Sequence, residues 1–171
     1  MTRAQLKQRL TFYVLLGLGA ILAVLVGRSV LRIENPNPSP VAAIGPTGLV
    51  EVVLTHNDAD QYVTTGRING EPVQFLIDTG SSEIAMSYQL ARRLGLQLRS
   101  GGLNITGNGT VQSWSAVLAS VDIGGLVAHG VRATVLPNMQ GDEALLGMAY
   151  LKHMELNLAG GRMTLRPFVS R

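Results

Sequence analysis

The sequence predicts an all-β domain with one or two short helices, preceded by a single N-terminal transmembrane helix. Three observations carry this prediction: short apolar runs punctuated by glycine from Leu49 onward, two hairpin signals, and one long uncharged stretch near the N-terminus. With 171 residues, the chain is long enough for one domain with a hydrophobic core plus an appendage.

The charge is unevenly distributed along the chain. Five of the 14 basic residues lie in the first 32 positions, which leaves nine basic and ten acidic residues from Gly45 onward. The domain is therefore near neutral, and there is no electrostatic case for a nucleic-acid partner. The absence of cysteine excludes disulfides, thiol catalysis and thiolate metal sites, but it is compatible with either redox compartment.

The uncharged stretch Leu10 to Gly27 has 18 residues, about the length that a helix needs to cross a bilayer. No small-x-small cleavage site follows it at Val26-Gly27-Arg28-Ser29, so it favours an uncleaved signal anchor at 10–27 after a short cytoplasmic N-terminus at 1–9. A buried core helix is the alternative. Cations flank both sides, so the positive-inside rule only weakly favours this orientation. We expect a single-pass protein of the inner membrane whose domain is periplasmic.

A proline-rich segment separates the anchor from the domain. Asn35-Pro36-Asn37-Pro38-Ser39-Pro40 predicts an extended tether at 28–48, ended by Gly45-Pro46-Thr47-Gly48. We expect this tether to hold the domain, at 49–171, away from the membrane.

Apolar runs in the domain predict strands, and two glycine pairs predict hairpins. Asn69-Gly70 and Gly124-Gly125 are the hairpin signals. The predicted strands are Val50 to Leu54, Tyr62 to Ile68, Val73 to Ile77, Ser115 to Ile123, Val131 to Leu136 and Arg162 to Leu165.

Two helices are predicted, one in each half of the domain. Ser87 can cap a helix over Tyr88 to Leu94 that stops at Gly95. A shorter helix is predicted from about Met148 to Met154. In each half, a hairpin turn with glycine is followed by a strand, a second turn with glycine and a helix. We interpret this repeated order as a degenerate internal twofold symmetry.

The segment Ile77-Asp78-Thr79-Gly80-Ser81 follows the apolar residues Val73, Phe75 and Leu76. This arrangement puts a carboxylate on a glycine turn where a buried strand ends, which is how an aspartic protease holds its catalytic acid. An exposed turn would also suit Asp-Thr-Gly taken alone. The chain carries one such triplet, whereas peptide hydrolysis by an aspartic protease needs two carboxylates that share a proton.

Over about Gln61 to Arg166 the chain resembles the retropepsin-like aspartic proteases (clan AA), and more closely a membrane-anchored bacterial branch of them. The resemblance rests on Asp78-Thr79-Gly80 with Ser81, on Leu145-Leu146-Gly147 before a short helix, and on the glycine-rich segment Thr106-Gly107-Asn108-Gly109-Thr110 between them. It implies a half-barrel fold and catalytic positions at Asp78, Thr79 and Gly80.

The resemblance implies a homodimer in which each subunit supplies one Asp78. Two carboxylates held about 3 Å apart cannot both ionise, so one activates a water while the other donates a proton to the peptide carbonyl. Gly80 would allow main-chain N–H groups to approach, and the Thr79 hydroxyl would bond across the dimer axis. No metal or other cofactor is needed. Arg162 to Phe168 could supply a C-terminal strand of the interface, and membrane tethering would raise the effective protomer concentration.

The glycine-rich segment also implies a mobile flap, with Gly107, Asn108 and Gly109 as substrate-binding residues. A flexible surface loop is the alternative there. Trp114 is interpreted as core or interface packing in preference to a substrate contact. We expect Glu83 to face solvent, Asp142-Glu143 to form a solvated turn, and Arg92-Arg93 to form the solvent-exposed face of a helix. We expect no functional role for the histidines His56, His129 and His153.

These features lead to a membrane-anchored, homodimeric aspartic endopeptidase acting on peptides or proteins, most active at acidic pH. The alternative is a non-catalytic module of the same fold that binds peptides or a partner protein. A membrane-tethered structural β-domain is a third hypothesis, but it leaves Asp78-Thr79-Gly80 unexplained.

Overall fold

The computed structural model describes residues 33–46, 48–106 and 109–168. The chain divides into two units, Met1–Ile33 and Glu34–Arg171, and the fold described here belongs to the second. The predicted anchor at 10–27 lies outside the described residues. Within the described ranges, no helix is long and apolar enough to cross a membrane.

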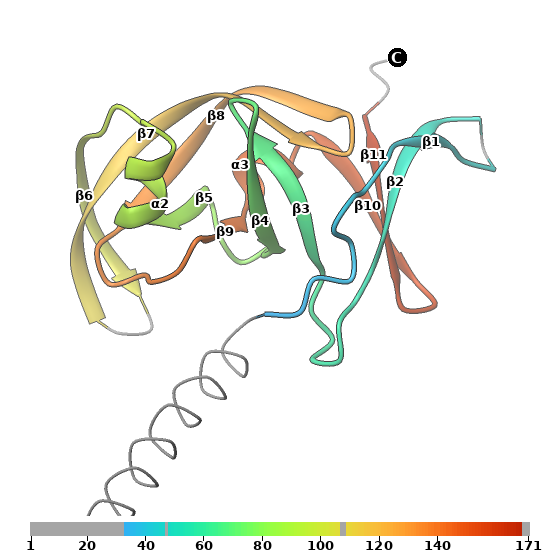
Figure 1. The fold of residues 1–171 in the computed structure, drawn as a ribbon, viewed down its shortest axis with the longest axis horizontal. Helices are drawn as coiled ribbons and strands as arrows, with labels where there is room; N and C mark the ends of the chain where they lie inside the picture. The colour runs from blue at the N-terminus through green and yellow to red at the C-terminus, as the bar shows by residue number, and fades with distance from the viewer. Residues whose placement is uncertain (1–32, 47, 107–108, 169–171) are drawn as a thin grey trace, which may run out of the picture. The chain divides into compact units, whose positions relative to one another are not determined.

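The second unit is built from short strands with two brief helices between them (Figure 1). In chain order they are β1 (Ala43–Ile44), β2 (Val50–Thr55), β3 (Val63–Ile68), β4 (Glu71–Ile77), β5 (Ile84–Ser87), α2 (Tyr88–Arg93), β6 (Arg99–Thr106), β7 (Gly109–Ile123), β8 (Leu126–Leu136), β9 (Glu143–Leu146), α3 (Met148–Leu151), β10 (Met154–Ala159) and β11 (Arg162–Pro167). The predicted all-β class with short helices is confirmed.

Seven strands form a sheet in the order β3-β4-β9-β5-β8-β7-β6, and β3 also pairs with β7. The second pairing joins Arg67 to Asp122 and Ile68 to Val121, so the sheet closes into a barrel. Closure brings β3 and β7 very near to each other at Gly66. A Cβ there would lie 2.6 Å from the Asp122 carbonyl oxygen, so only glycine fits.

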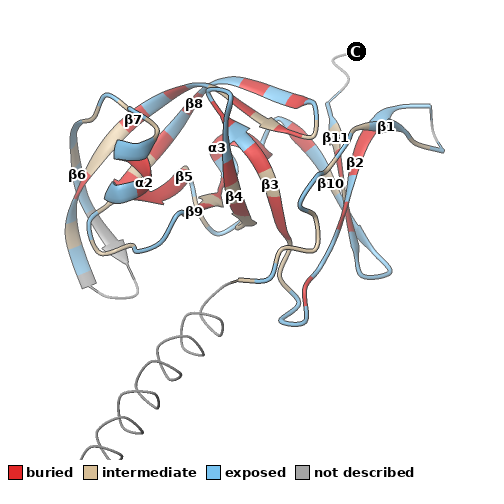
Figure 2. Ribbon diagram, in the orientation of Figure 1, coloured by how far each residue is buried: buried red, intermediate tan, exposed pale blue. Residues whose placement is uncertain are grey.

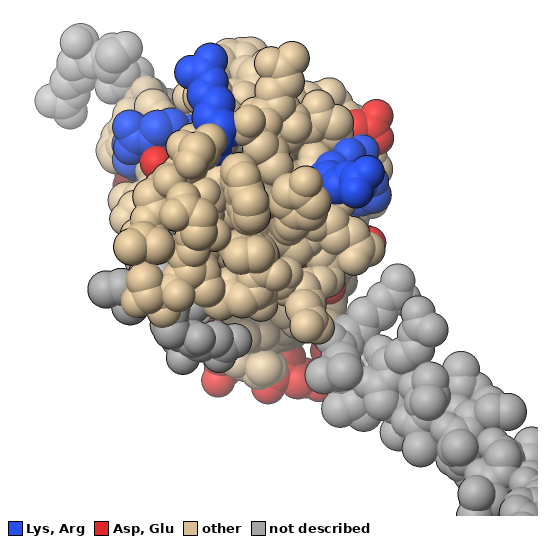
Figure 3. Space-filling model, turned by 90° about the vertical axis from the view of Figure 1, so that its left-hand side faces the viewer, with Lys and Arg blue, Asp and Glu red and all other residues tan. Residues whose placement is uncertain are grey.

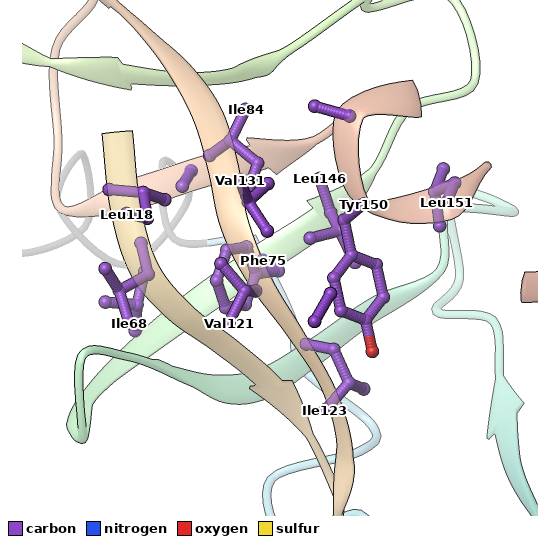
Figure 4. Packing of buried hydrophobic residues seen from close by; sticks show 14 of the residues in the cluster. Ile68, Phe75, Ile84, Leu118, Val121, Ile123, Val131, Leu146, Tyr150 and Leu151 are labelled. Atoms are coloured by element: carbon purple, nitrogen blue, oxygen red, sulfur yellow. The ribbon is translucent and has the colours of Figure 1, made fainter. Parts of the chain in front are cut away.

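The core fills the inside of this barrel, and buried and more exposed residues alternate along parts of its strands, such as most of β8, whereas β5 is buried throughout (Figure 2). Phe75 of β4, Leu146 of β9 and Tyr150 of α3 are fully buried together, as the close view in Figure 4 shows. The Tyr150 hydroxyl donates a hydrogen bond of 2.7 Å to the Leu126 carbonyl oxygen. Burial raises the pKa of Tyr150, with the charge of Asp122 as a second cause.

The local signals at the hairpins and the first helix are confirmed. Asn69 and Gly70 both have positive φ, at 51° and 87°, which suits a tight turn between paired strands. Ser87 caps α2 through a 3.0 Å bond from the Leu90 backbone N–H, and Gly95 follows with φ of 64°. The second helix is shorter than predicted, because Met154 already begins β10.

The predicted tether is wrong from Glu34 onward, since this part of the chain belongs to the folded unit. Asn37 attaches this segment to β2 and β3. Its side-chain amide accepts from the Thr55 backbone N–H at 2.9 Å and donates to the Thr55 and Val63 carbonyl oxygens at 2.8 and 2.7 Å. One amide thereby satisfies backbone groups of β2 and β3 that a strand would otherwise pair.

A second sheet has the order β1-β2-β11-β10. β11 lies inside it, between β2 and β10, so it is paired on both sides within the chain. That Arg162 to Phe168 supplies an interface strand stays a prediction. β10 is the outer strand, and no strand of the described residues pairs with its second edge.

Candidate active site

The site begins where two parallel strands end side by side. β4 pairs with β9 so that Ile77 lies opposite Leu146, and the Asp78 backbone N–H donates to the Leu146 carbonyl oxygen at 3.1 Å. The two sequence elements singled out earlier, Asp78-Thr79-Gly80 and Leu145-Leu146-Gly147, therefore leave the same edge of the sheet.

The Asp78 carboxylate is held by two donors from its own loop. Oδ1 accepts from the Gly80 backbone N–H at 2.9 Å, and Oδ2 accepts from the Ser81 hydroxyl at 2.6 Å. A Cβ on Gly80 would lie 3.2 Å from Oδ1 and would push it away. Asp78 is half-buried, and Thr79 between these residues is exposed. Hydrogen bonds from both sides fix one orientation of the acid.

Ser81 has a role that was not predicted from the sequence. Its hydroxyl makes the shorter of the two contacts to the Asp78 carboxylate. A hydroxyl-bearing residue directly after Asp-Thr-Gly is the signal that could have revealed this donor.

Gly147 allows the second strand end to approach the catalytic loop. A Cβ there would collide with the Glu83 carbonyl oxygen and would lie 2.6 Å from that of Ser81. The Met148 backbone N–H donates to the same Ser81 oxygen at 2.8 Å. The start of α3 therefore supports the loop that carries Asp78.

A cleft of about 570 Å³ opens next to this loop. It extends from the catalytic loop to the hairpin of β6 and β7 and to β8. The residues that line it are Gly80, Ser81, Ser82, Glu83, Ala85, Gly101, Gly102, Leu103, Ser113, Trp114, Ser115, Thr134 and Leu136. Trp114 packs against the hydrophobic core, which confirms the predicted packing role, and it also lines this cleft. Its ring packs on Tyr88 with centroids 5.4 Å apart.

Glu83 is also placed differently from expectation. Its side chain is only 27% exposed, and its two oxygens accept from Arg132 Nε at 2.8 Å and from the Thr134 hydroxyl at 2.7 Å. No sequence pattern predicts this arrangement, because Arg132 and Thr134 lie 49 and 51 residues further along the chain.

The predicted flap corresponds to the β6–β7 hairpin, but Gly107 and Asn108 lie outside the described residues. Gly109 begins β7. Nearer the cleft, the pairing of the two strands shifts between Ser100 and Leu103. Side chains of β7 secure this bulge, since Gln112 Nε2 donates to the Gly101 carbonyl oxygen at 2.7 Å and the Ser113 hydroxyl donates to that of Gly102 at 3.0 Å.

The remaining candidates lie apart from this site. His129 and His153 are exposed, and His56 contacts Asn57 and Asp60 on a loop. Asp142 lies 4.0 Å from Arg93 across exposed side chains. Among the described residues, no group of histidine and acidic side chains is arranged to hold a metal ion.

A comparison with protein families identifies this arrangement. Residues 64–153, which include both strand ends and the cleft, match the family described as "gag-polyprotein putative aspartyl protease". The chain belongs to this family of retropepsin-like aspartic proteases. The crystal structure of a retropepsin-like aspartic protease from Rickettsia conorii has the same fold, with a TM-score of 0.61 at 24% identity over 75% of this chain and 96% of that chain.

Two curated proteins are similar in sequence to this retropepsin-like protein, and both are uncharacterized. One, from Sinorhizobium and encoded in the region 5′ of cobV, is 33% identical over 114 residues, or 64% of this chain and 48% of that protein. The other, from Rickettsia prowazekii, is 27% identical over 112 residues, or 64% of this chain and 48% of that protein. The chain thus spans about half the length of the curated relatives it matches.

Proposed function

We propose that this protein is a homodimeric aspartic endopeptidase, anchored in the inner membrane by residues 10–27 and acting in the periplasm. The observation that carries the proposal is the Asp78 carboxylate, held by Gly80 and Ser81, two residues that line a cleft. A binding module has no need for a carboxylate fixed by donors on both oxygens.

The chemistry requires a second Asp78 from another copy of the chain. With two carboxylates about 3 Å apart, one stays protonated because both cannot carry charge at that distance. The ionised member takes a proton from a water between them, and the neutral member donates its proton to the carbonyl oxygen of the peptide bond. The hydrogen bonds from Gly80 and Ser81 keep each acid in the orientation that this exchange needs. We expect the highest activity at acidic pH.

The outer edge of β10 supports pairing with a second copy. The turn Gly160-Gly161 has positive φ at both residues, so the flanking pair Ala159 and Arg162 exchanges hydrogen bonds. Alternation then directs the backbone groups of Leu156 and Leu158 away from β11, toward the unpaired edge. Unpaired strand edges are templates for another strand.

Leu158 adds a hydrophobic argument for the same surface. It lies opposite Met163, on the side of the sheet that faces the core, yet it is 62% exposed whereas Met163 is 4% exposed. The apolar face of the sheet therefore continues to its edge, where Leu158 is exposed to solvent. A β10 strand from a second copy would extend the sheet and cover Leu158.

The proposed anchor would favour this dimer. Two chains confined to one membrane meet at a higher effective concentration than two chains in solution. A weak edge-to-edge interface could then be sufficient for activity in the membrane.

Cleavage of a diverse peptide library by the full chain, in detergent and from pH 3 to 7, tests the proposed activity. We expect cleavage by the wild type, rising more steeply than linearly with protein concentration, and none by Asp78→Asn. Equal cleavage by both proteins would contradict the proposal. No cleavage by a folded, dimeric wild type that still binds peptides would favour the non-catalytic binding module.

The dimer surface is tested separately by Leu158→Lys in the Asp78→Asn background, which prevents self-cleavage. We expect a shift toward monomer in sedimentation equilibrium, because a buried lysine at a strand edge opposes pairing. Val127→Lys is the matched control, since Val127 is 47% exposed on β8. A dimer unaffected by Leu158→Lys would exclude the β10 edge and leave the proposed activity untouched.

A further inference from the structure

Glu83 is the single ionisable side chain among the residues that line the cleft in the described part of the chain. It lies on a wall shared with a second, smaller hollow of about 250 Å³. Arg99 and Arg132 line that second hollow and not the cleft. Glu83 lines both spaces, whereas the two arginines line only the second, so among the described residues the acidic side chain is the one charged group that borders the cleft.

The Glu83 carboxylate is fixed in place but keeps capacity for another donor. Arg132 and Thr134 occupy one position on each oxygen, whereas a carboxylate has about four acceptor positions. The Arg132 side chain is 68% exposed, so solvent screens much of its charge. A donor arriving from the cleft can therefore bind an oriented and still negative group.

Trp114 supplies a second element of the same space. It is the one tryptophan of the chain, it lines the cleft with Glu83, and its packing on Tyr88 holds the ring in place. Tryptophan offers the best aromatic face for a cation, and it also packs on the methylene groups of long basic side chains. The surrounding face of the molecule near β6 and β7 carries its charged side chains mainly at the rim (Figure 3).

We propose that this cleft takes a lysine or arginine side chain of the substrate, with Glu83 accepting hydrogen bonds from the cationic group and Trp114 contacting the side chain. The inference rests on the proposed function, since it assigns a substrate preference to the same site. It makes Glu83 a specificity-determining residue and leaves the chemistry to Asp78.

The test uses the full chain and peptides that differ at one position, pairing lysine with norleucine and arginine with citrulline. At one position relative to the cleaved bond, we expect kcat/KM to favour the basic member by about tenfold or more, the effect of one charge-assisted hydrogen bond. Glu83→Gln is expected to remove this ratio. Glu71→Gln, an exposed control at the start of β4, is expected to preserve it.

Three outcomes would overturn the inference. The wild type could show no basic preference at any position, which needs no variant and so does not depend on whether Glu83→Gln folds. Glu83→Gln could lower kcat/KM equally for both members of each pair, which would indicate a contact to the peptide main chain or a positioning role. The ratio could also fall equally in Glu71→Gln, which would indicate a general effect of charge.

Binding without turnover separates this inference from the proposed activity. In Asp78→Asn, Trp114 fluorescence is a direct signal of cleft occupancy, because the chain has no other tryptophan. We expect lysine peptides to bind more tightly than norleucine peptides, and Glu83→Gln to abolish the difference. A difference that persists when the wild type cleaves nothing would support the inference while the proposed activity fails.

Discussion

β4 and β9 run parallel and end at the same edge of the sheet, yet the segments that follow them differ in chemistry. After β4 the chain places Asp78 in a loop whose residues Gly80 and Ser81 hold its carboxylate and line the cleft. After β9 the chain continues through Gly147 into α3, which packs into the core. One backbone arrangement thus carries the oriented Asp78 carboxylate on one side and the structural support of its loop on the other.

The contrast extends to the glycines of the two segments. Neither Gly80 nor Gly147 has a positive φ, so neither is needed for its backbone conformation. A Cβ on Gly147 would meet backbone oxygen atoms that cannot move independently, whereas a Cβ on Gly80 would meet a carboxylate oxygen that can rotate. Substitutions at the two positions should therefore affect different properties.

Gly147→Ala is expected to have the largest effect on folding. The added methyl collides with the Glu83 carbonyl oxygen and crowds that of Ser81, so the free energy of unfolding should fall by about 3 kcal/mol or more. Urea unfolding followed by circular dichroism measures it. A loss below about 1 kcal/mol would mean that the two strand ends do not hold each other tightly.

Gly80→Ala is expected to affect activity more than stability. The methyl group displaces Asp78 Oδ1, and misorientation of the acid should lower kcat/KM at least about tenfold. The free energy of unfolding should change by no more than about 1 kcal/mol, because the site is exposed. Peptide cleavage and urea unfolding of the same preparation test both statements. A large loss of stability with normal cleavage would mean that Gly80 is needed for folding and not for the orientation of Asp78.

Tyr150→Phe tests only the segment that follows β9, which includes α3. Removal of the hydroxyl leaves the buried Leu126 carbonyl oxygen without its 2.7 Å hydrogen bond, so the free energy of unfolding should fall by about 1 to 2 kcal/mol. Burial raises the pKa of Tyr150, so the stability that the neutral phenol provides is complete below about pH 10 and is lost as pH rises above it. Thermal unfolding at pH 7 and 9 should show equal losses.

Ser81→Ala is expected to have the smallest effect of the four. The Gly80 N–H still holds one oxygen of Asp78, so kcat/KM should fall by no more than about tenfold. Ser39→Ala, on an exposed part of the chain, serves as the control and should cleave like the wild type. A loss as large as that in Asp78→Asn would mean that the hydroxyl takes part in the reaction itself.

Local signals were sufficient for much of the fold. Asn69-Gly70 predicted a hairpin because few residue pairs adopt positive φ twice in succession, and Ser87 predicted the start of α2 because its side chain satisfies a free N–H group. The predicted strands did not include β1, β5, β6, β9 and β10. Among these, β5 and β9 have only four residues each, which is too few for an alternating pattern to be recognised.

The sequence by itself determined the family to which the chain belongs. Asp78-Thr79-Gly80 after an apolar strand, with Leu145-Leu146-Gly147 further along, is a pattern of residue types that local geometry explains. The membrane anchor at 10–27 and the homodimer remain predictions of the sequence, and the anchor lies outside the described residues.

Only the tertiary structure decided which side chains line the cleft next to the loop of Asp78. Glu83 meets Arg132 and Thr134, and Trp114 meets Tyr88, because sheet closure brings together residues that are distant in the chain. Asn37 was likewise predicted to be part of a tether, whereas in the fold its side chain forms hydrogen bonds with backbone groups of Thr55 and Val63. Local propensity determines turns and caps within a few residues, whereas long-range contacts depend on how the strands pair.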